Sequence, residues 1–196
     1  MNPKLRPLIP AFALLLVGLI ALGVSWYSVM GGAGDVPASA IERKFSLIDH
    51  TGRRVSEADY AGRPHIVFFG FTHCPDICPT TLYELSAILE HMGEDGEKFE
   101  VLLISVDPER DTPQALADYV ASFGPQFTGL TGTKEEIDAA AKAFKAYYRK
   151  VPLEGGDYTV DHTAVVYLFD DAGRFVAPFN YRRPPEEAAA ELRGLL

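Results

Sequence analysis

The residues of this sequence best suited to chemistry are its two cysteines, Cys74 and Cys78, which three residues separate. They lie in the segment Cys-Pro-Asp-Ile-Cys-Pro, between an apolar run that ends at Phe71 and a helical pattern. Pro79 fits best as the first helical residue, so the sequence predicts Cys78 as the N-cap of that helix. Thiols at a helix N-terminus lie at the positive end of the helix dipole, which favours the thiolate. The thiolate is the form that binds a metal ion or attacks a disulfide.

The spacing of the cysteines leaves several uses open. A thioredoxin-like redox pair has two intervening residues, whereas this chain has three. The longer spacing still permits a disulfide, and it also permits both sulfurs to converge on one ion. A purely structural disulfide would close a very short loop, so it would add little stability. As metal ligands, two thiolates prefer soft ions such as Cu(I), or zinc.

A metal site needs further ligands, and the candidates are the five histidines His50, His65, His73, His91 and His162. His50 is expected in a turn and His91 at a helix end, so both are expected to be solvated, while His65 begins a strand. His73 adjoins Cys74 in the sequence, and the direction of the chain there makes it difficult for both side chains to bind the same ion. His162 is the better candidate, because loops at strand ends meet the site at a helix N-terminus in layered α/β folds. From spacing alone, however, the stronger interpretation is that His162 is an ordinary loop histidine that binds no metal ion.

The elements around the cysteines predict an α/β layered domain. The apolar run His65–Phe71 predicts a strand buried on both faces, and a helix is expected from about Pro79 to His91. A small hairpin is expected over 45–55, and further strands over 100–106, 127–130, 163–169 and 174–178. Three more helices are expected: one opening at Thr112-Pro113, one from Lys134 to about Tyr148, and one from Pro184-Pro185. Strands that alternate with helices and end in an antiparallel hairpin are typical of this class.

Composition excludes several classes of protein. The chain has 196 residues, of which 47% are hydrophobic and 23% charged, and its net charge is −9. These values exclude a disordered chain and a membrane protein with many spans. Two cysteines are too few for a disulfide framework or a four-thiolate zinc site. The acidic balance argues against a nucleic-acid partner, because phosphate binding needs a basic surface.

The N-terminal part of the sequence predicts a single transmembrane anchor. No charged residue occurs from Pro7 to Gly34, and the apolar core over residues 8–30 is long enough to span a bilayer as one helix. Lys4 and Arg6 precede this core, so the positive-inside rule keeps residues 1–7 in the cytoplasm. A cleaved signal peptide is the alternative, with Ala38-Ser39-Ala40 resembling a cleavage site. The apolar core is longer than the usual signal-peptide core, and this site lies well beyond its end.

The anchor divides the chain into parts of different character. Residues 31–40 are expected to be a flexible linker, and residues 41–196 one exported domain. Lys4 and Arg6 are the only charges before Asp35. The exported part therefore holds 16 of the 18 basic and all 27 acidic residues, a net charge of −11. The expected location is the cytoplasmic (inner) membrane, crossed once, with the domain on the periplasmic or extracytoplasmic side.

Three motifs closely resemble the Sco/SenC family. They are FFGFTHCPDICPTT from Phe68, SVDPERDTP from Ser105 and VDHTAVVYLFDDAG from Val160. Members of this family are membrane-anchored, thioredoxin-like proteins that deliver copper during cytochrome c oxidase assembly. The resemblance implies a thioredoxin-like fold, with a central mixed sheet flanked by helices and an extra N-terminal hairpin.

The resemblance also implies that Cys74, Cys78 and His162 are copper ligands. Two thiolates and an imidazole suit Cu(I), and thiolate sulfur also supports Cu(II) when oxygen or nitrogen donors are added. Zinc would need a fourth ligand, for which Asp161 and His73 are nearby candidates. Asp161 either forms a hydrogen bond in the second shell of the site or caps the strand.

The second of the three motifs, SVDPERDTP, is expected to be structural. Asp107 and Asp111 are expected to cap turns, and Arg110 to pair with a carboxylate. A role of this motif in partner recognition is the weaker interpretation.

Two functions follow from the implied ligands. The first, which is not an enzyme activity, is a metallochaperone that takes copper from an upstream donor. It would pass the ion to the dinuclear copper site of cytochrome c oxidase subunit II. The second is a thiol–disulfide oxidoreductase that uses Cys74 and Cys78 as a redox-active pair to keep the cysteines of that subunit reduced. A reductase has no use for His162, so this residue distinguishes the two hypotheses.

Overall fold

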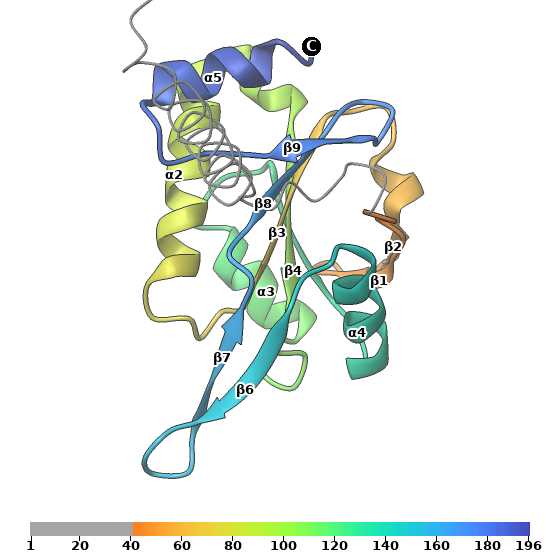
Figure 1. The fold of residues 1–196 in the computed structure, drawn as a ribbon, viewed down its shortest axis with the longest axis vertical. Coiled ribbons are helices and arrows are strands. Elements are labelled where there is room, and N and C mark those ends of the chain that lie inside the picture. Colours follow the sequence, from red (N-terminus) through yellow and green to blue (C-terminus); the bar gives the residue numbers. More distant parts are fainter. Residues whose placement is uncertain (1–40) are drawn as a thin grey trace, which may run out of the picture. The chain divides into compact units, whose positions relative to one another are not determined.

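A seven-stranded mixed sheet is the centre of the structure, a computed structural model that describes residues 41–196 (Figure 1). The strands lie in the order β2-β1-β5-β4-β3-β8-β9. Their bounds are β1 Ser46–Asp49, β2 Arg54–Ser56, β3 His65–Gly70, β4 Glu100–Ser105, β5 Phe127–Thr131, β8 Val166–Phe169 and β9 Phe175–Pro178. The three central strands β3, β4 and β5 are parallel, whereas the outer pairs are antiparallel. The predicted α/β class and the N-terminal hairpin, β1–β2, are confirmed.

Helices cover the parallel strands, which explains why those strands are apolar on both faces. The helices are α2 Ile77–Met92, α3 Pro113–Val120, α4 Lys134–Ala143 and α5 Pro185–Arg193, with short 3-10 helices at Glu57–Tyr60 and Gly93–Lys98. All six residues of β3 are buried, as the unbroken apolar run predicts. The hydroxyl of Ser86 on α2 donates to the carbonyl of Phe123 just after α3, so these two helices are neighbours.

Local signals in the sequence set several helix ends. The side chain of Thr112 accepts the backbone N–H of Ala115 and caps α3, with Pro113 as its first residue. At α4, Thr133 and Glu136 form a capping box. Both caps are therefore as predicted.

The predicted helix from Lys134 to Tyr148 is too long, and a hairpin is missing from the prediction. The helix ends at Ala143, because Lys145 has a positive φ of 55°, which no continuing helix permits. The chain then forms β6 (Tyr148–Pro152) and β7 (Tyr158–His162), an antiparallel sheet of its own. The next strand, β8, consequently begins at Val166 rather than Thr163.

The predicted membrane anchor, residues 8–30, and the predicted linker, residues 31–40, lie outside the described residues. Over residues 41–196, every helix is too short or too polar to cross a bilayer.

Candidate metal centre

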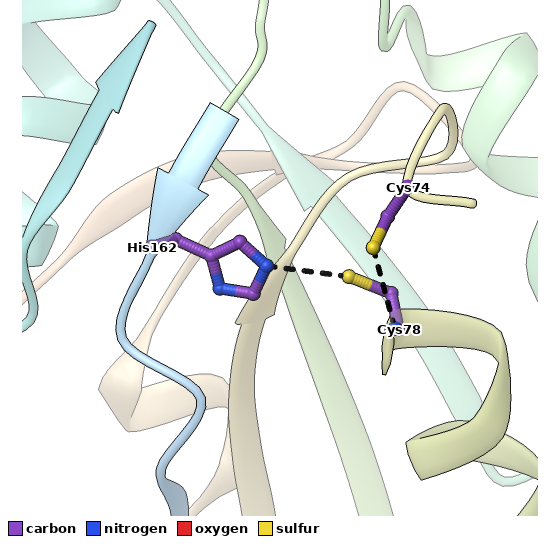
Figure 2. A group of neighbouring side chains, drawn as sticks. All are labelled: Cys74, Cys78 and His162. Atoms are coloured by element: carbon purple, nitrogen blue, oxygen red, sulfur yellow. Dashed lines mark hydrogen bonds between the residues drawn. The ribbon is translucent and has the colours of Figure 1, made fainter. Parts of the chain in front are cut away.

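The two cysteines lie where the central strand β3 passes into α2 (Figure 2). A turn after the strand, in which the Cys74 N–H donates to the Phe71 carbonyl at 3.2 Å, places Cys74 in the loop. The helix begins at Ile77 with Asp76 as N-cap, so Cys78 is its second residue and Pro79 its third. The predicted N-cap, Cys78, is therefore wrong by two residues. Proline is tolerated anywhere in the first turn, because an N–H there has no partner within the helix.

The sulfur atoms of the pair differ in exposure. The backbone N–H of Cys78 donates to the Cys74 Sγ at 3.4 Å, which draws the loop thiol to the helix N-terminus. Cys74 is partly exposed, whereas Cys78 is completely buried. Both residues are free thiols in this structure.

Gly70 makes room for the buried sulfur. A Cβ atom at this last residue of β3 would lie 3.0 Å from the Cys78 Sγ, 2.9 Å from the Phe68 ring and 3.1 Å from Leu103. The approach to Phe68 is closer than a Cβ atom is found to come, the other two are tight, and all three neighbours are buried. A side chain at position 70 would therefore displace the Cys78 sulfur.

His162 brings the third donor from the end of β7, 84 residues further along the chain. Its Nε2 lies 3.4 Å from the Cys78 Sγ, and its Nδ1 lies 3.1 Å from the carbonyl oxygen of Thr163. A carbonyl oxygen only accepts, so the Nδ1 carries the proton and the Nε2 lone pair faces the thiols. The rings of Phe68 and Phe71 meet the imidazole edge-to-face at 6.0 and 5.9 Å.

The Sγ atoms of Cys74 and Cys78 and a ring nitrogen of His162 all lie within 4.8 Å of one another. In the part of the chain that the structure describes, no other group of three or more histidine, cysteine or acidic residues is close enough to hold an ion. Two sulfurs and one imidazole nitrogen are a soft donor set, which suits Cu(I). The set contains three donors, so it leaves a coordination position for a ligand from another molecule.

Burial controls the protonation of these ligands. Burial raises the pKa of the Cys78 thiol above its usual value, although a hydrogen bond from the Phe71 backbone acts in the opposite direction. Burial also lowers the pKa of His162, so the imidazole is neutral at pH 7. The sequence predicts a thiolate at the helix N-terminus. This prediction is wrong for Cys78 in the protein without metal, because the raised pKa favours the neutral thiol.

The other residues considered as ligands lie away from the cluster. Asp161 is exposed, and its carboxylate accepts from Arg149 at 2.9 Å. The hydrogen bond that orients His162 comes instead from Thr163. His73 is exposed, and its Nδ1 lies 3.0 Å from the Thr72 hydroxyl.

The remaining histidines have structural surroundings. His91 is exposed, as predicted. The prediction of a solvated His50 is wrong, because the residue is half-buried and its Nδ1 accepts the Gly129 N–H at 3.2 Å. His65 begins β3 as predicted, and it is buried with its ring stacked on Phe169 at 5.0 Å.

In the SVDPERDTP motif, Arg110 pairs with a carboxylate as predicted, whereas the predicted turn caps are wrong. The Asp107 carboxylate accepts from the Arg110 side chain, and the Asp111 carboxylate accepts from Thr72 across the fold. Asp107 and Asp111 are completely buried, and Arg110 pairs with Asp107. Tyr158 of β7 also donates to Asp107, at 2.8 Å. No pattern in the sequence predicts this link, because the strand that carries Tyr158 is itself not predicted.

Comparison with known proteins identifies related chains. The model of the SCO1/SenC family matches residues 34–196. The human protein named "Protein SCO1 homolog, mitochondrial" is 42% identical over 151 residues, which cover 76% of this chain and 50% of the relative. The chain thus spans about half the length of the curated relatives that it matches.

Solved structures with the same fold include two Sco proteins. ScoI of Bradyrhizobium japonicum, solved with copper bound, is 50% identical with a TM-score of 0.76, and the match covers 80% of this chain and 100% of that one. BsSco, described as a member of the Sco family of cytochrome c oxidase assembly proteins with a disulfide switch, is 26% identical with a TM-score of 0.62. That match covers 79% of this chain and 92% of BsSco.

Proposed function

The chain belongs to the SCO1/SenC family, and from this membership we propose that it is a copper metallochaperone that binds copper through Cys74, Cys78 and His162. One observation carries the proposal: the three donor atoms of these residues lie within 4.8 Å of one another. The soft donor set and the 50% identity to a copper-bound ScoI both support copper as the ion.

The exposure of the ligands suits an ion that must leave again. Cys78 is buried beneath the loop, while Cys74 is partly exposed. A ligand from an acceptor protein therefore reaches the copper on the Cys74 side, where the three-donor set leaves a position open. Copper transfer proceeds by ligand exchange, and the buried Cys78 is the last of the three residues to release the ion.

The acceptor in this proposal is the dinuclear copper site of cytochrome c oxidase subunit II, and an upstream donor supplies the copper. The family's link to oxidase assembly, which the description of BsSco includes, supports this choice. The charge-free segment over residues 8–30 supports attachment to the cytoplasmic membrane, with residues 41–196 on its outer side.

The competing function is a thiol–disulfide oxidoreductase that keeps the cysteines of subunit II reduced. The close approach of the two cysteines, with the Cys78 N–H 3.4 Å from the Cys74 Sγ, favours it. So does the disulfide switch of BsSco. The neutral Nε2 of His162, which faces the thiols, favours the metallochaperone, because it completes a three-donor metal site.

A transfer experiment tests the proposal directly. The purified, reduced protein is loaded with one equivalent of Cu(I) and mixed with the reduced copper domain of subunit II. After separation by size, we expect copper to have moved to subunit II, as measured by elemental analysis. If copper stays behind while an oxidised subunit II is reduced by the same protein, the oxidoreductase is the correct function.

The protonation of Cys78 makes copper affinity depend on pH. Because burial raises the pKa of this thiol, copper displaces its proton on binding. The apparent affinity for Cu(I) is therefore expected to rise with pH, by about tenfold per unit for each proton displaced. The pKa of His162 is lowered, so its imidazole adds no proton competition above pH 7.

Competition with a colorimetric Cu(I) chelator between pH 6.5 and 8.5 measures this slope, with the pH dependence of the chelator determined separately. A flat profile would contradict the prediction, because it would mean that Cys78 is already a thiolate in the protein without metal.

A further inference from the structure

His162 lies in a different sheet from the strand that leads to the two cysteines. Cys74 and Cys78 follow β3 in the seven-stranded sheet, whereas β7, which ends at His162, pairs only with β6. Figure 1 shows the β6–β7 hairpin projecting from the rest of the domain. The backbone hydrogen bonds of the main sheet therefore do not include His162, so side-chain contacts can contribute to its position relative to the thiols.

One loop, residues 105–111 after β4, contacts both ligand-bearing segments. On the cysteine side, the buried carboxylate of Asp111 accepts the Thr72 N–H at 3.1 Å and the Thr72 hydroxyl at 2.6 Å. The hydroxyl of Ser105 donates to the same carboxylate at 2.6 Å. Asp111 thus fixes the chain two residues before Cys74.

On the histidine side, the same loop holds Tyr158. The buried Asp107 accepts the Tyr158 hydroxyl at 2.8 Å and also pairs with Arg110. Arg110 donates to the Tyr158 carbonyl at 3.1 Å, and its guanidinium lies 3.9 Å from the centre of the Tyr158 ring. Three contacts from two residues of one loop therefore converge on a single tyrosine.

Tyr158 is well placed to control His162. The two residues are the first and last of β7, and side chains two or four positions apart in a strand lie on the same face. Val160, between them on that face, is buried. Other contacts of the hairpin are more exposed, such as the Arg149–Asp161 ion pair, whose side chains are 63% and 55% exposed.

We infer that Tyr158 is a positioning residue for copper binding, which holds the His162 imidazole against the two thiols through its hydrogen bond to Asp107. This inference rests on the proposed function of the site. It assigns a role to the SVDPERDTP motif: the motif sets the distance between the two ligand-bearing segments. Loss of the Tyr158 hydroxyl leaves Arg110 in contact with Asp107 and Tyr158, but it removes the hydrogen bond that ties the turn end of β7 to Asp107.

A double-mutant cycle tests the inference, with Cu(I) affinity measured by chelator competition on the purified full chain. Tyr158→Phe is expected to weaken binding by about tenfold, the scale of one hydrogen bond to a charged group. In a His162→Ala background, the same substitution is expected to have no further effect, because Tyr158 acts through His162. The matched control is Arg149→Gln, which removes a contact beside His162 within the hairpin and is expected to leave the affinity unchanged.

A second measurement distinguishes a local change at the copper site from a change in folding. In the Cu(II)-loaded protein, the thiolate-to-copper absorption band of Tyr158→Phe is expected to shift toward that of His162→Ala, while the thermal midpoint reports the fold. An unchanged affinity in Tyr158→Phe, or an equal loss in both backgrounds, overturns the inference while the proposed function stands. If His162→Ala itself binds copper as the unsubstituted protein does, the proposed ligand set fails, and the inference fails with it.

Discussion

The protein with Cys78 replaced by serine is expected to stay folded and to lose tight Cu(I) binding. Serine has nearly the shape of cysteine, so it fills the same space against Gly70, and its hydroxyl can donate to the Nε2 of His162 as the thiol does. What it lacks is a soft sulfur donor. Loss of a direct ligand is expected to cost more than the 10–100-fold that loss of an outer-shell partner typically costs.

The measurement is a Cu(I) titration against a chelator of known affinity, with thermal unfolding followed in parallel. Thr81→Ser is a suitable control, because Thr81 is also completely buried on the same helix, and its hydroxyl bonds to the Ile77 carbonyl and Tyr181 rather than to the three donors. A Cys78→Ser variant that still binds one Cu(I) with the original affinity would show that Cys74 and His162 hold the ion without it.

Local patterns predicted most of the scaffold around Cys78. The run His65–Phe71 is apolar at nearly every position, and the structure buries β3 completely between helices. Thr112-Pro113 and Thr133 carried start signals that the structure uses as caps. These helix-start signals depend only on residues that are adjacent in the chain, so a single sequence is sufficient to recognise them.

The β6–β7 hairpin could not be predicted in the same way. Four of the five residues of β6 are charged, aromatic or proline, and none of the five is fully buried, so the strand lacks the alternation that marks a half-buried strand. The preceding helical pattern continued into it, and only the left-handed backbone at Lys145 ends the helix. The hairpin is held by side chains from distant loops, such as Asp107, rather than by a pattern of its own.

The protonation state of Cys78 could not be predicted from neighbouring residues in the sequence either. A cysteine at the start of a helix is expected to favour the thiolate, but Cys78 is completely buried, with its sulfur close to Gly70 of β3. That burial raises its pKa. The convergence of His162 on the thiols is likewise a property of the tertiary fold. The general placement of strand-end loops makes His162 the better candidate among the histidines, but only the resemblance to a family favours it over an ordinary loop histidine.

His162→Ala is expected to separate the two candidate functions. The substitution removes one of three donors and leaves both thiols in place, so Cu(I) affinity is expected to fall by orders of magnitude. The fold is expected to persist, because His162 is only half-buried and the hairpin keeps the contacts of Tyr158 with Asp107 and Arg110.

The decisive measurement is copper loading of the oxidase in cells that carry His162→Ala, compared with cells that carry Cys74→Ser. A metallochaperone requires all three donors, so both variants should leave subunit II without copper. An oxidoreductase requires only the thiols, so His162→Ala cells should assemble a copper-loaded oxidase while Cys74→Ser cells do not. The second pattern would transfer the role of this site from metal binding to disulfide exchange, because it would show that the two sulfurs suffice without the third donor.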